Sequence, residues 1–260
     1  MQAGRPPRQS WWFRKLRFLL QWVVALPLPR FGSVHLAYHP DTYTMVQGQP
    51  DFGVLVRRFT RFNRRNNSGD VHRLWTFMLN LQQIISDDIP GDFAELGVWR
   101  GNTASVLAHY ADACGRRVVL FDTFEGFDKR DMSGVDESRR QEFDDTSVQL
   151  VTEVIGSASR CCDFVKGRFP DSLRPEHRRA YAVVSLDCDL YEPMRAALDF
   201  FHAHMPRGGL LLIHDYMNPA WDGVKLAVDE FCARTGEFVV CIGDKSGSAV
   251  IRKSRGPAPA

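Results

Sequence analysis

Acidic residues and one histidine follow two apolar, strand-like runs in the second half of the chain. Asp187 and Asp189 come directly after the first run, and His214 and Asp215 come directly after the second. If both runs are parallel strands of one sheet, their carboxyl ends meet at one edge and these side chains converge. Carboxylate oxygens suit Mg²⁺, whereas an imidazole ligand favours Mn²⁺ or another borderline metal. The pattern predicts a divalent-metal site of Asp187, His214 and Asp215, with Asp187, Asp189 and His214 as catalytic residues.

A glycine turn links an apolar run to a helical pattern near the middle of the chain. The turn contains Glu95, Gly97 and Gly101 in the spacing E-x-G-x-x-x-G, which lets backbone N–H groups hold an anionic ligand group. A dinucleotide fingerprint needs glycine at the position of Trp99, because an indole there blocks a pyrophosphate. S-adenosylmethionine carries only a small carboxylate. The turn therefore favours this cofactor and predicts binding roles for Glu95, Gly97, Trp99 and Gly101.

A second apolar run, residues 117–122, ends in an acid 25 positions beyond Gly97. An acid at the end of the second strand accepts hydrogen bonds from the ribose hydroxyls of a bound adenosine. Asp122 and its neighbour Thr123 are therefore predicted to bind the cofactor. The alternative for Asp122 is a cap of the turn that follows it. With the methyl donor in place, a metal at Asp187 and Asp215 would lower the pKa of a substrate hydroxyl, so that its oxygen attacks the sulfonium methyl.

Strands and helices alternate from residue 92 onward, after a helical pattern at 75–85. This alternation predicts a doubly wound α/β fold with a mostly parallel, seven-stranded, Rossmann-like sheet, closed by an antiparallel pair. The polar stretch 128–145 is predicted to be either a mobile loop over the cofactor or a plain surface insertion. The first expected strand begins at residue 92; the other strands are 117–122, 161–167, 181–187, 208–215, 237–242 and 248–252, and the helices are 103–114, 144–155, 193–205 and 221–234.

Charge divides the 260 residues into two parts. Residues 1–70 contain eleven Lys/Arg and only three Asp/Glu, so the net negative charge lies in the rest of the chain. We predict a basic, aromatic and helical appendage (1–70), a cofactor-binding domain (71–254) and a flexible tail (255–260). The amphipathic segment 11–26 is too short to span a bilayer, and no signal-peptide cleavage site follows it. It is either a helix lying on the inner face of an anionic membrane or a dimer-forming or core-packing helix, so a homo-oligomer is one outcome.

The remaining composition indicates a globular protein of the cytoplasm. Hydrophobic residues make up 44% of the chain, which is enough for a sizeable core. The six cysteines show no C-x-x-C pair or regular spacing, so they are predicted to be reduced thiols. A run of five arginines between 57 and 65 is either a surface for lipid or an acidic substrate, or an ordinary solvated helix face. No nucleic acid is expected as a partner; the expected partner is a small-molecule or glycan acceptor.

Four blocks of the sequence resemble the macrocin O-methyltransferase family. The resemblance implies a class I methyltransferase fold and S-adenosylmethionine-dependent, Mg²⁺-assisted O-methylation, typically of a sugar hydroxyl on a natural product or glycan. By position, it implies that Gly97, Trp99 and Thr103 hold the methionine end, that Asp122 holds the ribose, and that Asp187 and Asp215 bind metal. Family members commonly have two adjacent acids at the end of the fifth strand, and here the first is His214. The four blocks are Gly91–Gly101, Phe121–Gly126, Leu186–Pro193 and Gly223–Phe231.

Four functions are compatible with these residues. The leading one is a metal-assisted O-methyltransferase. The second is a metal-free methyltransferase with His214 or Asp189 as the base. The third takes Asp187-Cys-Asp189 as the D-x-D motif of a glycosyltransferase, and the fourth is a non-catalytic, membrane-associated protein that binds the cofactor.

Overall fold

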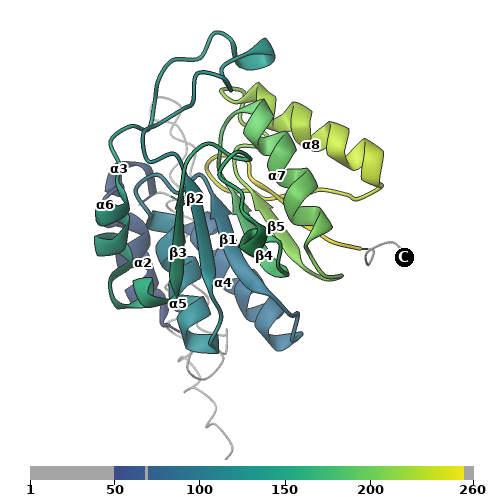
Figure 1. Ribbon diagram of the computed structural model, residues 1–260. Helices are drawn as coiled ribbons and strands as arrows, with labels where there is room; N and C mark the ends of the chain where they lie inside the picture. The colour runs from purple at the N-terminus through teal and green to yellow at the C-terminus, as the bar shows by residue number, and fades with distance from the viewer. Residues whose placement is uncertain (1–49, 68–69, 255–260) are drawn as a thin grey trace, which may run out of the picture. The chain divides into compact units, whose positions relative to one another are not determined.

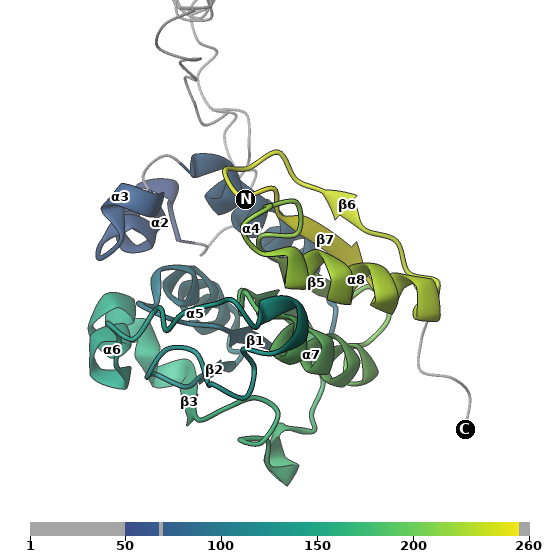
Figure 2. The same ribbon diagram turned by 90° about the horizontal axis from the view of Figure 1, so that it is seen from above.

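The described residues of the protein form one seven-stranded sheet in a computed structural model. The structure describes residues 50–67 and 70–254, all within the compact unit Met45–Ala260. The strand order is β3-β2-β1-β4-β5-β7-β6, which is the class I methyltransferase order; β1 to β5 are labelled in Figure 1, and β6 and β7 in Figure 2. This confirms the predicted fold class. The strands are β1 (Asp92–Leu96), β2 (Val118–Asp122), β3 (Cys162–Lys166), β4 (Tyr181–Leu186), β5 (Leu210–Ile213), β6 (Val240–Cys241) and β7 (Ala249–Arg252).

Strands β1 to β5 are parallel, whereas β7 pairs antiparallel with both β5 and β6. The closing antiparallel pair is therefore as predicted. Strand β6 is much shorter than the expected 237–242. The reason is that Glu237 turns inward, where its carboxylate accepts hydrogen bonds from the backbone N–H of Ser254 at 3.1 Å and contacts His202.

Helices cover both faces of the sheet because successive strand residues point to opposite sides. One face packs against α2 (Phe52–Thr60), α4 (Val71–Ser86), α5 (Asn102–Cys114) and α6 (Val148–Ile155). The other face packs against α7 (Tyr191–Ala203) and α8 (Asp222–Thr235). Figure 2 shows these two helical layers on opposite sides of the sheet. The result is a three-layer sandwich with two separate hydrophobic cores.

The turn after β1 fits only glycine at its first position. Gly97 has φ +84°, and a Cβ atom on it would lie 2.0 Å from the carbonyl oxygen of Asp187. The backbone N–H of Asp187 also donates to the carbonyl of Leu96 at 2.9 Å. The ends of β1 and β4 are thus in direct backbone contact, and any side chain at position 97 would push them apart.

The loop between β2 and α6, residues 123–147, is fastened to the rest of the fold at several places, two of which reach the start of α7 and the glycine turn. Asp136 is fully buried, and its carboxylate accepts the backbone N–H of Tyr191 at 2.7 Å, the first residue of α7. A carboxylate at a helix N-terminus is stabilised by the unpaired N–H groups there. A Cβ on Gly223, at the start of α8, would lie 2.6 Å from the same carboxylate. Asp145 forms the second attachment, described with the site below.

Helix α2 brings the arginine run into contact with α6. Leu55 and Phe59 of α2 are buried in the core. The guanidinium of Arg58 donates to the carbonyl of Val154 at 2.9 Å, and that of Arg61 donates to the carbonyl of Glu153 at 3.2 Å. These two arginines therefore satisfy carbonyl groups at the C-terminal end of α6. The short helix α3 (Arg64–Asn67) follows directly.

The predicted amphipathic segment 11–26 lies outside the described residues, as does the tail 255–260. The domain boundary at residue 70, the membrane contact, the homo-oligomer and the cytoplasmic location all stay predictions. Across residues 50–67 and 70–254, no helix is both long and apolar enough to cross a membrane.

Candidate functional site

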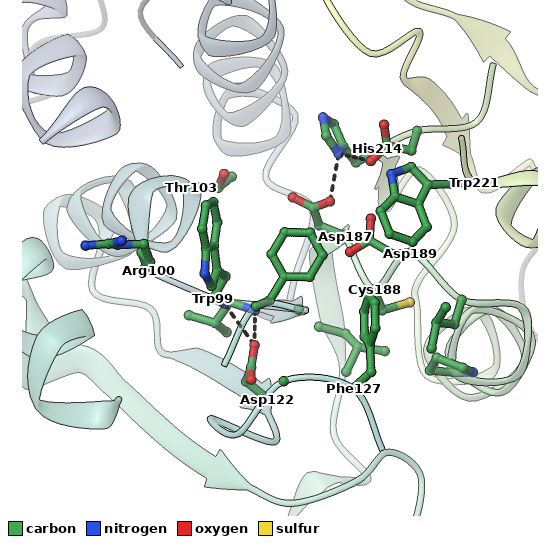
Figure 3. Close-up of a pocket in the computed structure, with 18 of the residues that line it drawn as sticks. Trp99, Arg100, Thr103, Asp122, Phe127, Asp187, Cys188, Asp189, His214 and Trp221 are labelled. Carbon is green, nitrogen blue, oxygen red and sulfur yellow. Dashed lines mark hydrogen bonds and ion pairs between the residues drawn. The ribbon is translucent and has the colours of Figure 1, made fainter. Parts of the chain in front are cut away.

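A cavity of about 300 Å³ opens at the carboxyl ends of the parallel strands. This is where open α/β sheets bind their ligands. Figure 3 shows Asp122 below Trp99, with Asp187, Asp189 and His214 gathered on the other side of the cavity. Glu95 and Gly101 do not line it. The predicted residues that do are Gly97, Trp99, Thr103, Asp122, Thr123, Asp187, Asp189, His214 and Asp215.

The carboxylate of Asp122 holds the glycine turn in place. One oxygen accepts the backbone N–H groups of Val98 and Trp99 at 2.7 and 2.9 Å, and the other accepts that of Phe124 at 2.6 Å. Trp99 has φ +43°, an uncommon backbone conformation that these bonds stabilise. A carboxylate has about four lone-pair positions, so these three bonds leave room for about one further donor. Asp122 thus caps the turn, and its binding of a ribose stays a prediction.

Trp99 also connects the glycine turn to the β2–α6 loop. Its indole N–H donates to Asp145 at 2.7 Å, and Arg100 contacts the other oxygen of the same carboxylate at 2.7 Å. The hydroxyl of Thr146 donates to the carbonyl of Trp99. Helix α6 accordingly begins only at Val148, because residues 144–146 bind the turn and do not join the helix. The loop reaches the cavity, as the first of the two predicted alternatives requires; its mobility stays a prediction.

The aromatic side chains of this loop form a wall of the cavity. Phe143 packs against Trp99 and Phe127, with ring centroids 5.2 and 5.4 Å apart. Trp221, just before α8, lies 5.9 Å from Phe127 and 6.2 Å from Phe143. All four rings line the cavity. Only Trp99 was predicted, because the other three lie in segments that read as loop or helix and carry no motif.

Asp187, His214 and Asp215 come together at the ends of β4 and β5. The backbone N–H of His214 donates to the carbonyl of Leu186, so register alone places the two strand ends side by side. His214 Nδ1 lies 2.7 Å from Asp187 Oδ1 and 2.6 Å from Asp215 Oδ2. Ligand atoms of all three residues lie within 4.8 Å of one another. The predicted convergence is therefore present.

The contacts around His214 resemble a ligand set more than a hydrogen-bonded pair. Neither ring nitrogen has an aligned hydrogen-bond partner among the described residues, although two carboxylate oxygens crowd Nδ1. Burial and the charge of Arg73 lower the pKa of His214, but the carboxylates of Asp187 and Asp215 outweigh them and raise it to about 10. Two carboxylates and one imidazole fit a divalent ion of the borderline class.

Asp189 lies beside this cluster in a strained position. Its backbone φ is +60°, and its side chain is buried. Burial, together with the charges of Asp187 and Asp215, raises the pKa of Asp189 well above its usual range. A carboxyl group with a raised pKa at a cavity wall suits proton transfer.

Glu95 lies behind the cavity wall. The register of β1 and β4 pairs it with Ser185, so both side chains lie on the same face of the sheet, and Glu95 accepts a hydrogen bond from the hydroxyl of Ser185 at 3.0 Å. Burial and the charge of Asp187 raise the pKa of Glu95 well above its usual range, and its second oxygen has no partner among the described residues. A direct contact between Glu95 and a cofactor stays a prediction; the observed contacts are internal.

Arg73 is a cavity residue that the sequence analysis missed. It lies in the first turn of α4, whose N-terminus is capped by Asp70. Its Nη2 donates to Asp187 Oδ2 at 2.8 Å, and its Cζ lies 5.7 Å from the Phe77 ring centroid. The residue is only 6% exposed. A basic residue in the first turn of a helix carries no sequence signal for an ion pair 114 residues away.

The far side of the cavity is polar. Lys245, in the segment between β6 and β7, contacts the residues that precede α4. Its backbone N–H donates to the Asp70 carboxylate, and its ammonium group donates to the carbonyl of Asn66 at 2.9 Å. Asn218 donates to Asp215 at 2.6 Å. The amide-bearing and other polar residues on this side are Asn63, Asn66, Asn67, Asn218, Lys245 and Ser246.

The chain is similar to known O-methyltransferases. Residues 69–237 match the model of the macrocin O-methyltransferase (TylF) family. The 8-demethyl-8-(2,3-dimethoxy-alpha-L-rhamnosyl)-tetracenomycin-C 4'-O-methyltransferase of Streptomyces olivaceus is 32% identical over 177 residues, 63% of this chain and 66% of the relative. The demethyldecarbamoylnovobiocin O-methyltransferase of Streptomyces niveus is 28% identical over 178 residues, again 63% and 66%. Both matches thus span slightly less than two thirds of the relative's own length.

Solved structures show the same fold. The O-methyltransferase NovP matches with a TM-score of 0.62 and 25% identity, over 71% of this chain and 81% of NovP. The calicheamicin methyltransferase CalS11 matches with a TM-score of 0.57 and 20% identity, over 83% of this chain and 99% of CalS11.

Proposed function

The chain belongs to the macrocin O-methyltransferase family, and on that premise we propose that it transfers a methyl group from S-adenosylmethionine to a sugar hydroxyl. The observation that carries this proposal is a single cavity with two chemically different ends. The glycine turn and Asp122 lie at one end, and Asp187, His214 and Asp215 lie at the other. A donor bound along the turn would direct its methyl group toward the cluster, where an acceptor hydroxyl can approach.

The turn supports S-adenosylmethionine over a dinucleotide. Trp99 lines the cavity at the position where a pyrophosphate would need glycine. Its indole is fixed by Asp145 and by the edge-on ring of Phe143, so it is not free to swing away. Gly97, Thr103, Asp122 and Thr123 also line this end, and we assign them to the cofactor.

The polar side of the cavity supports a sugar acceptor over a flat phenol. Side-chain amides offer both donors and acceptors, which suit several hydroxyl groups at once. Trp221 adds one aromatic face at the same end. The relatives from Streptomyces are named for rhamnosyl-tetracenomycin and novobiocin precursors, and on that likeness we place the acceptor among sugars of natural products or glycans.

We further propose that a divalent ion assists the reaction at Asp187, His214 and Asp215. Two carboxylates and an imidazole that gives up its proton when the ion binds are a suitable donor set, and His214 has no aligned partner of its own among the described residues. Imidazole favours Mn²⁺ or another borderline metal over Mg²⁺. When bound, such an ion would act as a Lewis acid on the acceptor hydroxyl.

The chain's own residues supply the proton acceptor. Asp189 is buried at the cavity wall with a raised pKa, which makes its carboxylate a stronger base than an exposed aspartate. His214 is a weaker candidate, because its raised pKa keeps it protonated at neutral pH. Asp189 is therefore the base in a metal-free variant of the mechanism as well. The D-x-D glycosyltransferase alternative has no support from the family match.

Two measurements test the proposal. Calorimetric titration of the full chain with S-adenosylhomocysteine, UDP and NADH should give tight binding of the first alone. Transfer of a labelled methyl group to a panel of rhamnosides and other glycosides should then be measured with EDTA, Mg²⁺ and Mn²⁺. Tight S-adenosylhomocysteine binding without transfer to any glycoside would contradict the sugar acceptor. Full activity in EDTA would contradict metal assistance and leave Asp189 as the base.

A further inference from the structure

A buried arginine contacts one of the three proposed metal ligands. Asp187 uses one carboxylate oxygen toward His214 Nδ1 and the other toward Arg73 Nη2, at 2.7 and 2.8 Å. Arg73 and Asp187 come from α4 and the end of β4, which meet only in the folded protein. The cluster therefore contains a permanent cation before any metal ion arrives.

The position of this cation makes its charge effective. The side chain of Arg73 is 7% exposed and that of Asp187 is 22% exposed, so water screens their interaction poorly. Arg73 is also held from behind, by the Asp70 cap of its helix and by the ring of Phe77. It cannot withdraw to solvent as a surface lysine would. A metal ion bound by Asp187 Oδ1 would therefore share the Asp187 carboxylate with a guanidinium that stays in place.

We propose that Arg73 is a built-in counter-cation that limits the affinity of the Asp187–His214–Asp215 cluster for a divalent ion. The proposal rests on the metal site proposed above. The guanidinium already occupies Asp187 Oδ2, and its charge opposes the charge of an arriving ion. Metal binding is therefore weaker than three such ligands would give alone.

The effect of removing Arg73 on metal affinity distinguishes a counter-cation from an arginine that only stabilises the fold. If Arg73 only stabilised the fold, its removal would loosen Asp187 and weaken metal binding. As a counter-cation, its removal leaves the cluster more negative by one charge and strengthens metal binding. Arg116 offers a matched control. Its guanidinium also lies over a phenylalanine, 5.5 Å from the ring centroid of Phe93, and donates to the carbonyl of Gly91 at 3.0 Å, away from the cavity.

The experiment measures Mn²⁺ binding to the metal-free full chain by the loss of the free-ion electron paramagnetic resonance signal, so no acceptor is needed. The variants are Arg73→Met, Arg73→Gln and Arg73→Lys, with Arg116→Met as control and circular dichroism to establish folding. Arg73→Met and Arg73→Gln should bind Mn²⁺ about 10-fold more tightly or better, because an interaction between charges at this separation is worth that much in a partly buried site. Arg73→Lys keeps the charge and should stay within about threefold of the unmodified chain. Arg116→Met should not change the affinity.

Each outcome decides between the two proposals. Equal or weaker Mn²⁺ binding by folded Arg73→Met or Arg73→Gln overturns the counter-cation and leaves the metal site intact. Binding by these variants but not by the unmodified chain supports the counter-cation and contradicts metal assistance in the natural sequence. No binding by any variant overturns both. If Met and Gln at position 73 prevent folding, Arg73→Lys still decides, because a change of about 10-fold or more in that charge-preserving variant overturns the proposal.

Discussion

Replacing Gly97 with alanine tests the backbone contact that joins the glycine turn to Asp187. Two costs are expected. The residue has φ +84°, and a left-handed conformation costs an alanine about 1–2 kcal/mol. The new Cβ would also lie 2.0 Å from the Asp187 carbonyl oxygen and 2.5 Å from its carbonyl carbon. Relieving that overlap means separating the ends of β1 and β4, and overpacking of this kind costs about 1–3 kcal/mol or more.

Gly115 provides the comparison that isolates the second cost. Its φ is +72°, but a Cβ there would meet nothing within 4 Å. Gly115→Ala should therefore lose only the backbone term, about 1 kcal/mol, and Gly97→Ala should lose both terms, about 2–5 kcal/mol. For a domain of this size, these losses lower the melting temperature by about 3 °C and on the order of 10 °C, respectively.

The assay is thermal unfolding followed by circular dichroism, with S-adenosylhomocysteine calorimetry on the folded protein. Gly97→Ala should also lose cofactor affinity, because the shift moves the turn that lines the cavity, whereas Gly115→Ala should keep it. Equal melting temperatures and equal affinities for the two variants would refute the close backbone approach as the reason for glycine at position 97.

Three further substitutions test the site. Asp122→Ala should weaken S-adenosylhomocysteine binding about 100-fold in calorimetry, because a charged acceptor is lost from the turn and from the predicted ribose site; unchanged affinity would place the ribose elsewhere. Asp187→Asn should remove most methyl transfer to an active glycoside yet leave S-adenosylhomocysteine affinity within about threefold, and a loss in affinity alone would argue against a role in the chemical step. Asp136→Ala should speed tryptic cleavage of the β2–α6 loop about 10-fold, since the loop loses its attachment to α7, and an unchanged rate would show that the other attachments, such as Asp145 and Asp131, hold it without Asp136.

The sequence predicts which site residues lie at the strand ends better than it predicts which residues of helices and loops contact them. The proximity of Asp187 and His214 is predictable from the sequence, because neighbouring parallel strands place their carboxyl ends at one edge of the sheet. Glu95 was assigned to the cofactor from the spacing of the turn. Its contact with Ser185 comes from the register of β1 with β4, which the spacing of the turn does not contain.

Residues from outside the alternating strands were not predictable in the same way. Arg73 reaches the site only because α4 packs on the sheet face near β4, and helix packing is not encoded in local spacing. Phe143 lies in a stretch that is polar on average, so composition concealed a side chain that packs against Trp99. In both cases the contact joins residues far apart in the chain, and the local pattern around either residue does not indicate it.

The burial of Asp136 has a consequence for exchanging loops between members of the family. The β2–α6 loop lines the cavity, so transplanting it is an obvious way to alter acceptor choice. Its carboxylate at position 136, however, fits against Gly223 of another element, where a Cβ would come within 2.6 Å. The residues at positions 136 and 223 therefore depend on each other. A donor loop without an acid at position 136 leaves the start of α7 uncapped. A recipient protein without glycine at position 223 has no space for that acid. A working chimera therefore has to move residues 136 and 223 together, although 87 positions separate them in the chain.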